Sequence, residues 1–495
     1  MRRAVAAGAG VLLSFAFAPR GWWPLAVLSP AILFWLWQGA SRRDAAWLGF
    51  WFNAGTFSVG TYWLYTSIHG FGQAPVWLAL MLMAGLVAIM GTYHAALGYS
   101  AARWLPARGP LRWLVGLPAA WLLTEWFRGW FLSGFSWLSL GYSQTDTLLA
   151  RYAPVLGVYG ISALLLMSAG ALVMLGFART ARPRVIAAAV LALPWIVAMA
   201  LDVQWTRAAG RATGVAVIQG AIPQDMKWLE ANRDATLERY AKLTREALGT
   251  PLIVWPESAV PDLANNVGSY LGSLYREAGR SGSALAIGVV RASDAGDQVF
   301  NSVLVMGERG VGWYDKRHLV PFAEYFPVPG FVRNWLRLMS LPYSDFTHGS
   351  RSQPPLIAAA LRLLPTICYE DAYGTSQLAQ MADANVLVNV TNDAWFGRSS
   401  ARYQHLQIAR MRAIEAGRYI VRAANDGVSA VIGPRGEIVA RAPEHEPAVL
   451  RAEIVPHTGL APYAHFGNWP ILLLAVAAVT LAAAQRFRLG ARAAA

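Results

Sequence analysis

A carboxylate, an ammonium and a thiol each follow a short apolar run, at Glu257, Lys316 and Cys368. Of these, the thiol of Cys368 is the candidate nucleophile. Cys368 is the only cysteine among 495 residues, and it comes directly after the apolar run 361–367 and before Glu370 and Asp371. A thiol attacks acyl carbon as the thiolate. Its ordinary pKa of about 8.5 leaves it mostly protonated at neutral pH, so a nearby base or cation is needed to form the thiolate. The pattern predicts a strand, a sharp turn that carries the sulfur, and a helix over residues 372–382. The alternative is a buried structural cysteine.

Two other strand ends offer partners for a thiol. Glu257 follows the apolar run 252–255 and Pro256, and a carboxylate there can serve as a general base. Lys316 follows an expected hairpin whose turn is residues 307–310. The chain has only three lysines against 39 arginines. A lysine retained at position 316 therefore indicates that the compact charge of an ammonium group is needed.

Glu257, Lys316 and Cys368, in this order, resemble the nitrilase or carbon–nitrogen hydrolase superfamily. The resemblance runs from about residue 214 to residue 453 and includes the strings Asn301-Ser302 and residues 392–397. It implies that Glu257 is the base, that Lys316 stabilises the tetrahedral oxyanion, and that Cys368 becomes acylated.

The elements between these motifs alternate between strand and helix. Alternation of this kind predicts an α/β sandwich, which the resemblance specifies as α-β-β-α layers. We expect strands at 214–219, 284–290, 299–306, 386–390, 419–423 and 428–432, and helices at 229–248 and 402–416.

The composition places the rest of the chain in a membrane. Hydrophobic residues make up 56%, charged residues 14%, and the mean hydropathy is +0.36. Eight apolar segments approach the ~20 residues that span a bilayer: 4–19, 22–38, 45–66, 76–102, 111–128, 154–178, 185–202 and 469–485. The first could instead be a cleaved signal peptide, but it lacks a small-x-small cleavage pattern. We expect a seven-helix bundle at 1–202, an external catalytic domain at 203–465, and a last span with a tail at 466–495.

The arginines predict the orientation of these spans. Thirteen arginines fall in the connections and ends on one side, and three fall in the short loops on the other. Cytoplasmic loops are the arginine-rich ones, so both termini are expected in the cytoplasm and residues 203–465 outside it. The net charge of +14 is then partly a topological signal, and no motif suggests nucleic-acid binding. The eight histidines lack the spacing of metal ligands, so we expect no metal and no cofactor.

Three further features have a functional and a structural interpretation. Glu125 and Arg128 form a charged pair near the end of a span, which indicates either a secondary site or an interfacial arginine. The basic, apolar segment 329–339 predicts either a lid on a bilayer surface or a core helix. Trp228 and Trp395 could line a groove for an acyl chain or belong to the core.

Taken over nearly its whole length, the chain resembles the apolipoprotein N-acyltransferase family. The strings that carry this resemblance are residues 125–130, 255–257, 321–325 and 368–370. It implies acyl transfer from a phospholipid, with phosphatidylethanolamine as the usual donor, to the amine of the S-diacylglyceryl cysteine of a bacterial lipoprotein. It also implies an enzyme of the bacterial inner membrane, which we expect to be a monomer, with roles for Trp228, Glu324, Tyr369 and Glu370.

Two other functions remain open at this point. A membrane-anchored amidase or nitrilase would use the same three residues and let water accept the acyl group. A channel or transporter with a degenerate external domain is the third possibility, although the bundle lacks a row of intramembrane carboxylates.

Overall fold

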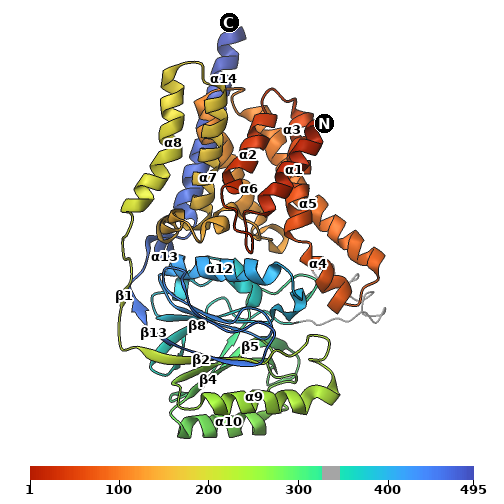
Figure 1. The fold of residues 1–495 in the computed structure, drawn as a ribbon, viewed down its shortest axis with the longest axis vertical. Helices are drawn as coiled ribbons and strands as arrows, with labels where there is room; N and C mark the ends of the chain where they lie inside the picture. Colours follow the sequence, from red (N-terminus) through yellow and green to blue (C-terminus); the bar gives the residue numbers. More distant parts are fainter. Residues whose placement is uncertain (326–345, 495) are drawn as a thin grey trace. The chain divides into compact units, whose positions relative to one another are not determined.

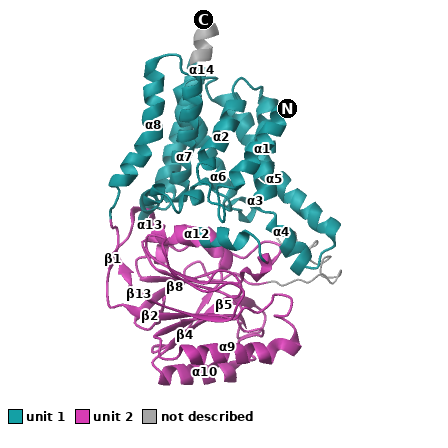
Figure 2. Ribbon diagram, viewed as in Figure 1, with its two compact units in different colours: residues 1–203, 398–407, 465–495 teal, residues 204–397, 408–464 magenta. Residues whose placement is uncertain are grey.

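The computed structural model describes residues 1–325 and 346–494, with side chains up to residue 488. The chain divides into two compact units (Figure 2). Unit 1 comprises residues 1–203, 398–407 and 465–495, and unit 2 comprises residues 204–397 and 408–464.

Unit 1 is built from helices (Figure 1). Its longer helices are α1 (Arg2–Ser14), α2 (Leu25–Leu36), α3 (Arg42–Gly60), α5 (Val76–Trp104), α6 (Leu117–Arg128), α7 (Ala153–Phe177), α8 (Ala181–Ala200) and α14 (Trp469–Ala494). Short helical segments connect them: α4 (Trp63–Tyr65), η1 (Thr66–Phe71), η2 (Leu111–Gly116), η3 (Phe131–Ser133), η4 (Leu140–Gln144) and η5 (Leu148–Tyr152).

Four helical segments of the described chain are long and apolar enough to cross a membrane: Val76–Trp104, Leu148–Phe177, Ala181–Ala200 and Trp469–Arg488. They correspond to four of the eight expected spans, so the expected count of eight is not confirmed. Helix α6 continues from η2 without a break, so residues 111–128 are helical, but this segment contains Arg112, Glu125 and Arg128. Helices α1 and α2 have only 13 and 12 residues. At 1.5 Å per residue they are shorter than the ~30 Å hydrocarbon layer. Helix α3 has 19 residues but starts with Arg42, Arg43 and Asp44.

Glycines let three helices of unit 1 approach closely. A Cβ atom at Gly10 would lie 1.8 Å from the carbonyl oxygen of Phe52, and one at Gly49 would lie 2.1 Å from that of His94. These contacts join α1 to α3 and α3 to α5. Small residues at helix contacts are typical of membrane bundles, where burial of apolar surface does not drive helices together.

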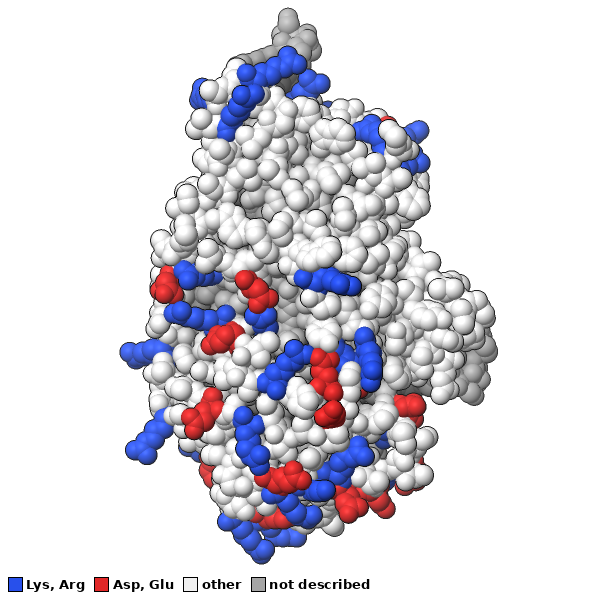
Figure 3. Space-filling model, viewed as in Figure 1, with Lys and Arg blue, Asp and Glu red and all other residues white. Residues whose placement is uncertain are grey.

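The surface of unit 1 is largely uncharged. On the face of unit 1 drawn in Figure 3, arginine side chains gather at the end where the termini lie, and the surface beyond them is white. The exposed side chains include large apolar ones on α5 and α14, among them Trp77, Leu80, Leu473 and Leu474. Apolar surface of this extent fits contact with lipid rather than water.

Unit 2 contains two six-stranded sheets. The first has the order β13-β2-β3-β4-β5-β6, with strands β2 (Thr213–Gln219), β3 (Leu252–Val254), β4 (Ala284–Ala292), β5 (Val299–Gly307), β6 (Gly310–Asp315) and β13 (Ala448–Ile454). The second has the order β12-β11-β10-β9-β8-β7, with strands β7 (Leu356–Ala358), β8 (Leu361–Ile367), β9 (Val386–Thr391), β10 (Ile420–Ala424), β11 (Ala430–Ile432) and β12 (Ile438–Arg441). A separate ribbon pairs β1 (Arg207–Ala208) with β14 (His457–Thr458).

Each sheet has three neighbouring parallel strands at its centre, β2-β3-β4 in one and β8-β9-β10 in the other. Strand β6 also runs parallel to β4, because each pairs antiparallel with β5. The carboxyl ends of β2, β3, β4 and β6 therefore meet at one edge of the first sheet, which is where functional groups commonly gather in α/β folds.

Helices cover the sheets. Helices α9 (Arg233–Ala247) and α10 (Gly268–Arg280) lie against the first sheet (Figure 1). Residues 408–416 of α12 (Ala401–Ala416) belong to unit 2, and α13 (Pro462–Phe466) follows β14. Ala409, Arg412 and Ala416 of α12 line a cavity of about 40 Å³ together with residues of the second sheet. Unit 2 is thus an α-β-β-α sandwich, as the sequence predicted.

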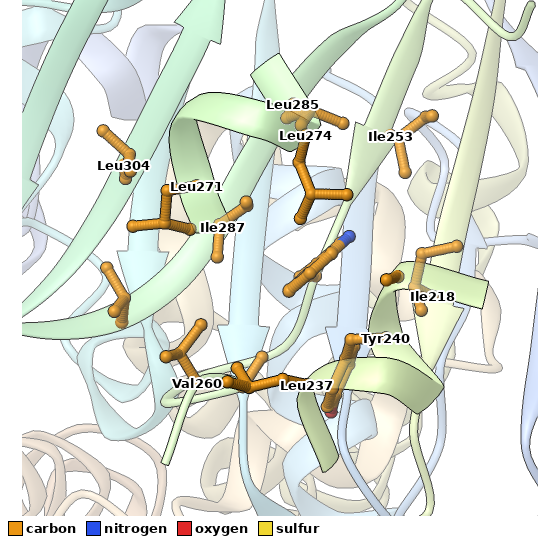
Figure 4. Packing of buried hydrophobic residues seen from close by; sticks show 14 of the residues in the cluster. Ile218, Leu237, Tyr240, Ile253, Val260, Leu271, Leu274, Leu285, Ile287 and Leu304 are labelled. Carbon is orange, nitrogen blue, oxygen red and sulfur yellow. The ribbon is translucent and has the colours of Figure 1, made fainter. Parts of the chain in front are cut away.

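Alternating side chains of the first sheet enter two different cores. Ile218, Ile253 and Ile287 pack against α9 and α10, where Tyr240 and Leu274 meet them (Figure 4). Their neighbours along the strands, such as Val217 and Val254, face the second sheet instead. This two-residue period explains why these strands are apolar throughout, because both faces are buried.

Most expected elements of unit 2 are present. The short or peripheral strands β1, β7, β12, β13 and β14 were not expected, and two further features differ from expectation. Residues 372–382 do not form a helix; they contain only the 3-10 helices η7 (Cys368–Ala372) and η8 (Leu378–Gln380). The intervening Gly374, Thr375 and Ser376 favour turns over helix. Helix α10 was not expected, although Leu271, Leu274 and Ala278 recur at helical spacing and are buried.

Candidate functional site

The carboxyl ends of β3 and β6 bring Glu257 and Lys316 together. Glu257 lies three residues beyond β3, and Lys316 directly follows β6. The ammonium Nζ of Lys316 donates to Glu257 Oε1 at 3.2 Å and to Glu324 Oε1 at 2.9 Å. The Lys316 side chain is only 1% exposed and the two carboxylates 9% and 12%. Two of the three predicted catalytic residues are therefore in direct contact, and Glu324 is the second counter-ion of the lysine.

Asn301 completes this cluster. Its side-chain amide donates to Glu257 Oε1 at 2.7 Å and to Glu324 Oε1 at 2.9 Å, so both carboxylates share the same two donors. The backbone N–H of Lys316 also donates to the Asn301 carbonyl oxygen at 2.8 Å. Asn301 belonged to a string that the sequence singled out, but its contact with both carboxylates could not be predicted.

An ion pair at the preceding residue, Asp315, restricts the position of Lys316. Arg291 on β4 donates to both carboxylate oxygens of Asp315, the last residue of β6, at 2.9 and 2.7 Å. The Arg291 guanidinium also lies over the rings of Phe300 and Trp313. A bidentate pair of this kind has little orientational freedom. It holds the end of β6 in register and thereby orients the lysine that follows.

Cys368 lies at the end of β8, where the strand turns into η7. The residue as a whole is half-buried. Its backbone φ of +50° is in the left-handed region, which a non-glycine residue adopts only at a cost of about 1–3 kcal/mol. Ser258, next to Glu257, and Ala221, which follows β2, have φ angles of +47° and +48°. Backbone strain thus recurs at these three strand ends.

Glu370 connects the turn at Cys368 to the loop after β6. One carboxylate oxygen accepts hydrogen bonds from the Ile367 N–H at 2.8 Å and the Tyr314 hydroxyl at 3.0 Å. The other accepts from the Arg317 and His318 backbone N–H groups at 2.7 and 3.2 Å. Glu370 is 1% exposed. Its hydrogen bonds connect the neighbours of Lys316 in sequence to the residue before Cys368.

A second polar network lies next to the sulfur. Asp393 pairs with the fully buried Arg422 at 2.9 Å and accepts a hydrogen bond from the Thr391 hydroxyl at 3.1 Å. The Thr391 side chain also hydrogen-bonds Cys368. This network connects the end of β9 and the middle of β10 to Cys368.

The charges around the thiol oppose its ionisation. Burial and then the negative charge of Glu257 raise the pKa of Cys368 well above its ordinary value, while Lys316 lowers it. Burial on its own would lower the pKa of Lys316, but Glu257 and Glu324 hold that pKa well above the ordinary value. Both shifts favour the protonated forms, a neutral thiol and a charged ammonium. The thiol needs a base to become a nucleophile.

Lys227 is a functional candidate that the catalytic motifs did not reveal. It follows β2 in an irregular loop, it is 1% exposed, and its Nζ donates to the backbone carbonyl of Glu257 at 3.2 Å. Burial lowers the pKa of Lys227 to about 8, although Glu257 and Cys368 act in the opposite direction. The sequence drew attention to this position only as a neighbour of Trp228.

The predicted supporting residues of unit 2 differ in exposure. Trp228 and Trp395 are 52% and 41% exposed, which agrees with a surface role rather than the core role that was the alternative. Tyr369 is buried next to Cys368, and its ring meets that of Tyr373 edge-on at 5.3 Å.

Arg128 belongs to unit 1 and is buried there. It donates to the Trp137 carbonyl oxygen at 2.7 Å and to the Ser139 hydroxyl at 3.3 Å, and it lies over the ring of Phe57. Glu125, one turn earlier in α6, accepts from Trp121 and from the Leu140 backbone N–H. These contacts fasten the loop after α6 and contradict the interpretation of Arg128 as an interfacial arginine that extends into solvent.

The expected lid at residues 329–339 lies outside the described residues. Among residues 1–325 and 346–494, no group of histidine, cysteine, aspartate and glutamate side chains could hold a metal ion.

Two family models match the chain. The model for the apolipoprotein N-acyltransferase N-terminal domain matches residues 9–171, and the model for carbon-nitrogen hydrolase matches residues 214–462. The second match covers the two sheets of unit 2 and all three predicted catalytic residues.

Curated proteins match nearly the entire chain. An apolipoprotein N-acyltransferase of Methylococcus capsulatus is 40% identical over 97% of this chain and 95% of its own length. Those of Pseudomonas putida and Photobacterium profundum are 41% and 37% identical, over 95% and 97% of this chain and 94% of their own lengths in both cases. The resemblance that the strings around Glu257, Lys316 and Cys368 indicated is confirmed, and the chain belongs to the apolipoprotein N-acyltransferase family.

Proposed function

We propose that this acyltransferase takes an acyl chain from a membrane phospholipid, with phosphatidylethanolamine as the favoured donor, and carries it as a thioester on Cys368. The chain then passes to the N-terminal amine of a diacylglyceryl-modified lipoprotein. The observation that carries this proposal is the cluster of Glu257, Lys316 and Glu324, whose charges act on the half-buried Cys368 at a strained strand end. The cluster supplies a base and a fixed positive charge, which acyl transfer requires.

In the first half-reaction, Glu257 takes the thiol proton as the sulfur of Cys368 attacks the ester carbonyl carbon. A carbon–sulfur bond forms and the carbonyl oxygen becomes an oxyanion, which Lys316 and the backbone N–H of Tyr369 stabilise. The intermediate collapses by breaking the bond to the glycerol oxygen. Glu257 returns its proton to that oxygen, and a lysophospholipid leaves.

In the second half-reaction, the lipoprotein amine attacks the thioester carbonyl carbon. A carbon–nitrogen bond forms and the same groups hold the oxyanion. Glu257 takes a proton from the amine, the carbon–sulfur bond breaks, and the proton passes to the departing sulfur. The products are an amide and the free thiol, so the enzyme returns to its starting state in a ping-pong cycle.

The remaining residues position these groups. Glu324 and Asn301 hold Lys316 and Glu257 in one arrangement. The Lys316 ammonium and the Asn301 side-chain amide both donate to one oxygen of Glu257 and one oxygen of Glu324, at 2.7–3.2 Å. Glu370 fixes the turn of Cys368 relative to the loop of Lys316. Trp228 and Trp395, both exposed, are suited to contact the acyl chains of the two lipid substrates.

We assign the enzyme to the bacterial inner membrane, as a monomer with residues 1–202 and 466–495 in the membrane part and residues 203–465 on the periplasmic side. The support is the distribution of arginines, with thirteen on the side of both termini. The donor lipid and the lipid-modified acceptor both reside in that membrane, which keeps their reactive groups near its surface.

Product analysis distinguishes transfer from hydrolysis. Purified enzyme in vesicles of phosphatidylethanolamine, supplied with a synthetic diacylglyceryl peptide, is expected to yield an N-acylated peptide and lysophospholipid in equal amounts. Free fatty acid in place of the N-acylated peptide would support the amidase-like alternative, with water as the acceptor. Phosphatidylglycerol vesicles in parallel test the choice of head group.

A further inference from the structure

Lys227 is a second ammonium in the site. Its Nζ lies 3.2 Å from the backbone carbonyl oxygen of Glu257, and its side chain is almost fully buried. A lysine ammonium has three N–H donors. Within the described residues, the carbonyl of Glu257 is the hydrogen-bond partner recorded for Lys227, so the group retains donors for a negatively charged atom. Trp228 is its other neighbour, with the Nζ 5.9 Å from the ring centre.

The net charge of the cluster around Lys316 is negative, and Lys227 can offset it. Glu257 and Glu324 together carry two negative charges, and Lys316, bonded to both, supplies one positive charge. Acylation moves one of these negative charges from Glu257, which takes the thiol proton, onto the sulfur and then onto the carbonyl oxygen. A buried site with an excess negative charge opposes that step, because charges interact strongly where water is excluded.

We propose that Lys227 is the second cation of the acylation step. Held on the Glu257 carbonyl, its ammonium offsets the charge of the second carboxylate and stabilises the negative charge that develops at Cys368 and the carbonyl oxygen. The inference rests on the proposed function, because it concerns the thioester-forming half-reaction.

The proposal has a consequence for pH dependence. The titratable groups that act on Lys227 are Glu257, from the loop after β3, and Cys368, from the turn after β8. The pKa of Lys227 is lowered to about 8, whereas those of Lys316 and Cys368 are held well above their ordinary values. Of the two ammonium groups and the thiol, Lys227 is thus the first to lose its proton as the pH rises. The acylation rate is expected to fall as the pH passes about 8.

The test compares three variants of the full-length enzyme in phosphatidylethanolamine vesicles. Lys227→Gln keeps a donor for the Glu257 carbonyl and removes the charge. Lys227→Arg keeps a charge that does not titrate in this range. Lys242→Gln, at an exposed position on α9, is the matched control. The rate of thioester formation on Cys368 is measured by quenched-flow mass spectrometry between about pH 6 and 9.5, together with thermal unfolding.

We expect Lys227→Gln to form the thioester roughly 10- to 100-fold more slowly near pH 7, with no further decline above pH ~8. Lys227→Arg should recover part of the rate and should also lack the alkaline decline, while Lys242→Gln should match the wild type. A Lys227→Gln enzyme with the wild-type rate and alkaline decline would overturn the inference. If Lys227→Gln does not fold, an unchanged alkaline decline in Lys227→Arg would overturn it equally.

These outcomes are distinct from failure of the proposed function. If the wild type acquires no acyl group on Cys368, the thioester mechanism itself is wrong. If it does, and the two Lys227 variants behave as the wild type, only the role of Lys227 is wrong.

Discussion

At Cys368 the chain places a thiol that resists ionisation beside a carboxylate that can take its proton. Burial and Glu257 both raise the thiol pKa, so little thiolate exists before substrate binds. A protonated resting thiol is also protected from oxidation, because the thiolate is the reactive form. This protection is useful to a cysteine that we assign to the outer side of the membrane.

Glu257→Gln tests the role of the base at the residue scale. Glutamine has nearly the same shape but cannot take the thiol proton, so thioester formation is expected to slow by about 10²- to 10⁴-fold. The measurement is single-turnover acylation of Cys368. Glu277→Gln is the control, because Glu277 lies on the surface and pairs only with Arg245 among the described salt bridges. Acylation of Glu257→Gln at the wild-type rate would exclude Glu257 as the base.

The sequence predicted the residues that follow continuous apolar strands and missed those whose role depends on neighbours in space. Glu257, Lys316 and Cys368 each end an apolar run, which local sequence shows. Lys227 follows no such signal, and it reaches Glu257 only because β2 and β3 pair in parallel and send their loops to the same edge.

At the scale of elements, β4 controls where Glu257 lies. Gly288 of β4 faces the loop of Glu257 so closely that an added Cβ atom would lie 2.2 Å from the Pro256 carbonyl oxygen and 2.6 Å from the Glu257 Cα. Backbone atoms at such distances must move apart. The glycine therefore sets the approach of the loop to the sheet.

Gly288→Ala should displace Glu257 and lower kcat by about 100-fold, because a shift of about 1 Å in a catalytic group can cost that much. Overpacking should also lower the free energy of unfolding by about 1–3 kcal/mol. Gly272→Ala on α10 is the control, since its Cβ would meet only the end of Arg276 at 3.7 Å. Steady-state kinetics and thermal unfolding measure both effects. Unchanged kinetics in Gly288→Ala would contradict this account of the loop.

Helices and strands were predicted correctly where the local sequence pattern fits only one type of secondary structure. The prediction failed where tertiary contacts determine the secondary structure. Central strands of unit 2 such as β2, β3, β9 and β10 are buried on both faces and were recognisable as apolar runs. The helix expected at residues 372–382 is absent because glycine, threonine and serine interrupt it. In unit 1, apolar composition alone could not distinguish the four long helices from shorter ones such as α1 and α2.

At the scale of the whole molecule, function depends on which side of the membrane unit 2 occupies. The acceptor that we propose is a lipoprotein with a free amine on a lipid-modified cysteine, and the catalytic unit must lie on the side of the membrane where that amine is found. The arginine distribution predicts that residues 203–465 are periplasmic and that both termini are cytoplasmic.

Single-cysteine labelling tests this orientation. Cys368→Ala removes the only cysteine, so a new cysteine becomes the only labelling site. In cells with a permeabilised outer membrane, Lys242→Cys in unit 2 should react with a membrane-impermeant maleimide. Arg182→Cys, at the exposed start of α8, should react only after the inner membrane is disrupted. The reverse pattern would place the catalytic unit in the cytoplasm and contradict the assignment.

The most direct test of the central claim is the intact mass of the wild-type protein after incubation with phosphatidylethanolamine and no acceptor. We predict one added acyl mass, located on the peptide that contains Cys368, removed by neutral hydroxylamine and absent from Cys368→Ala. An acyl group on another residue, or one that resists hydroxylamine, would contradict a thioester on Cys368.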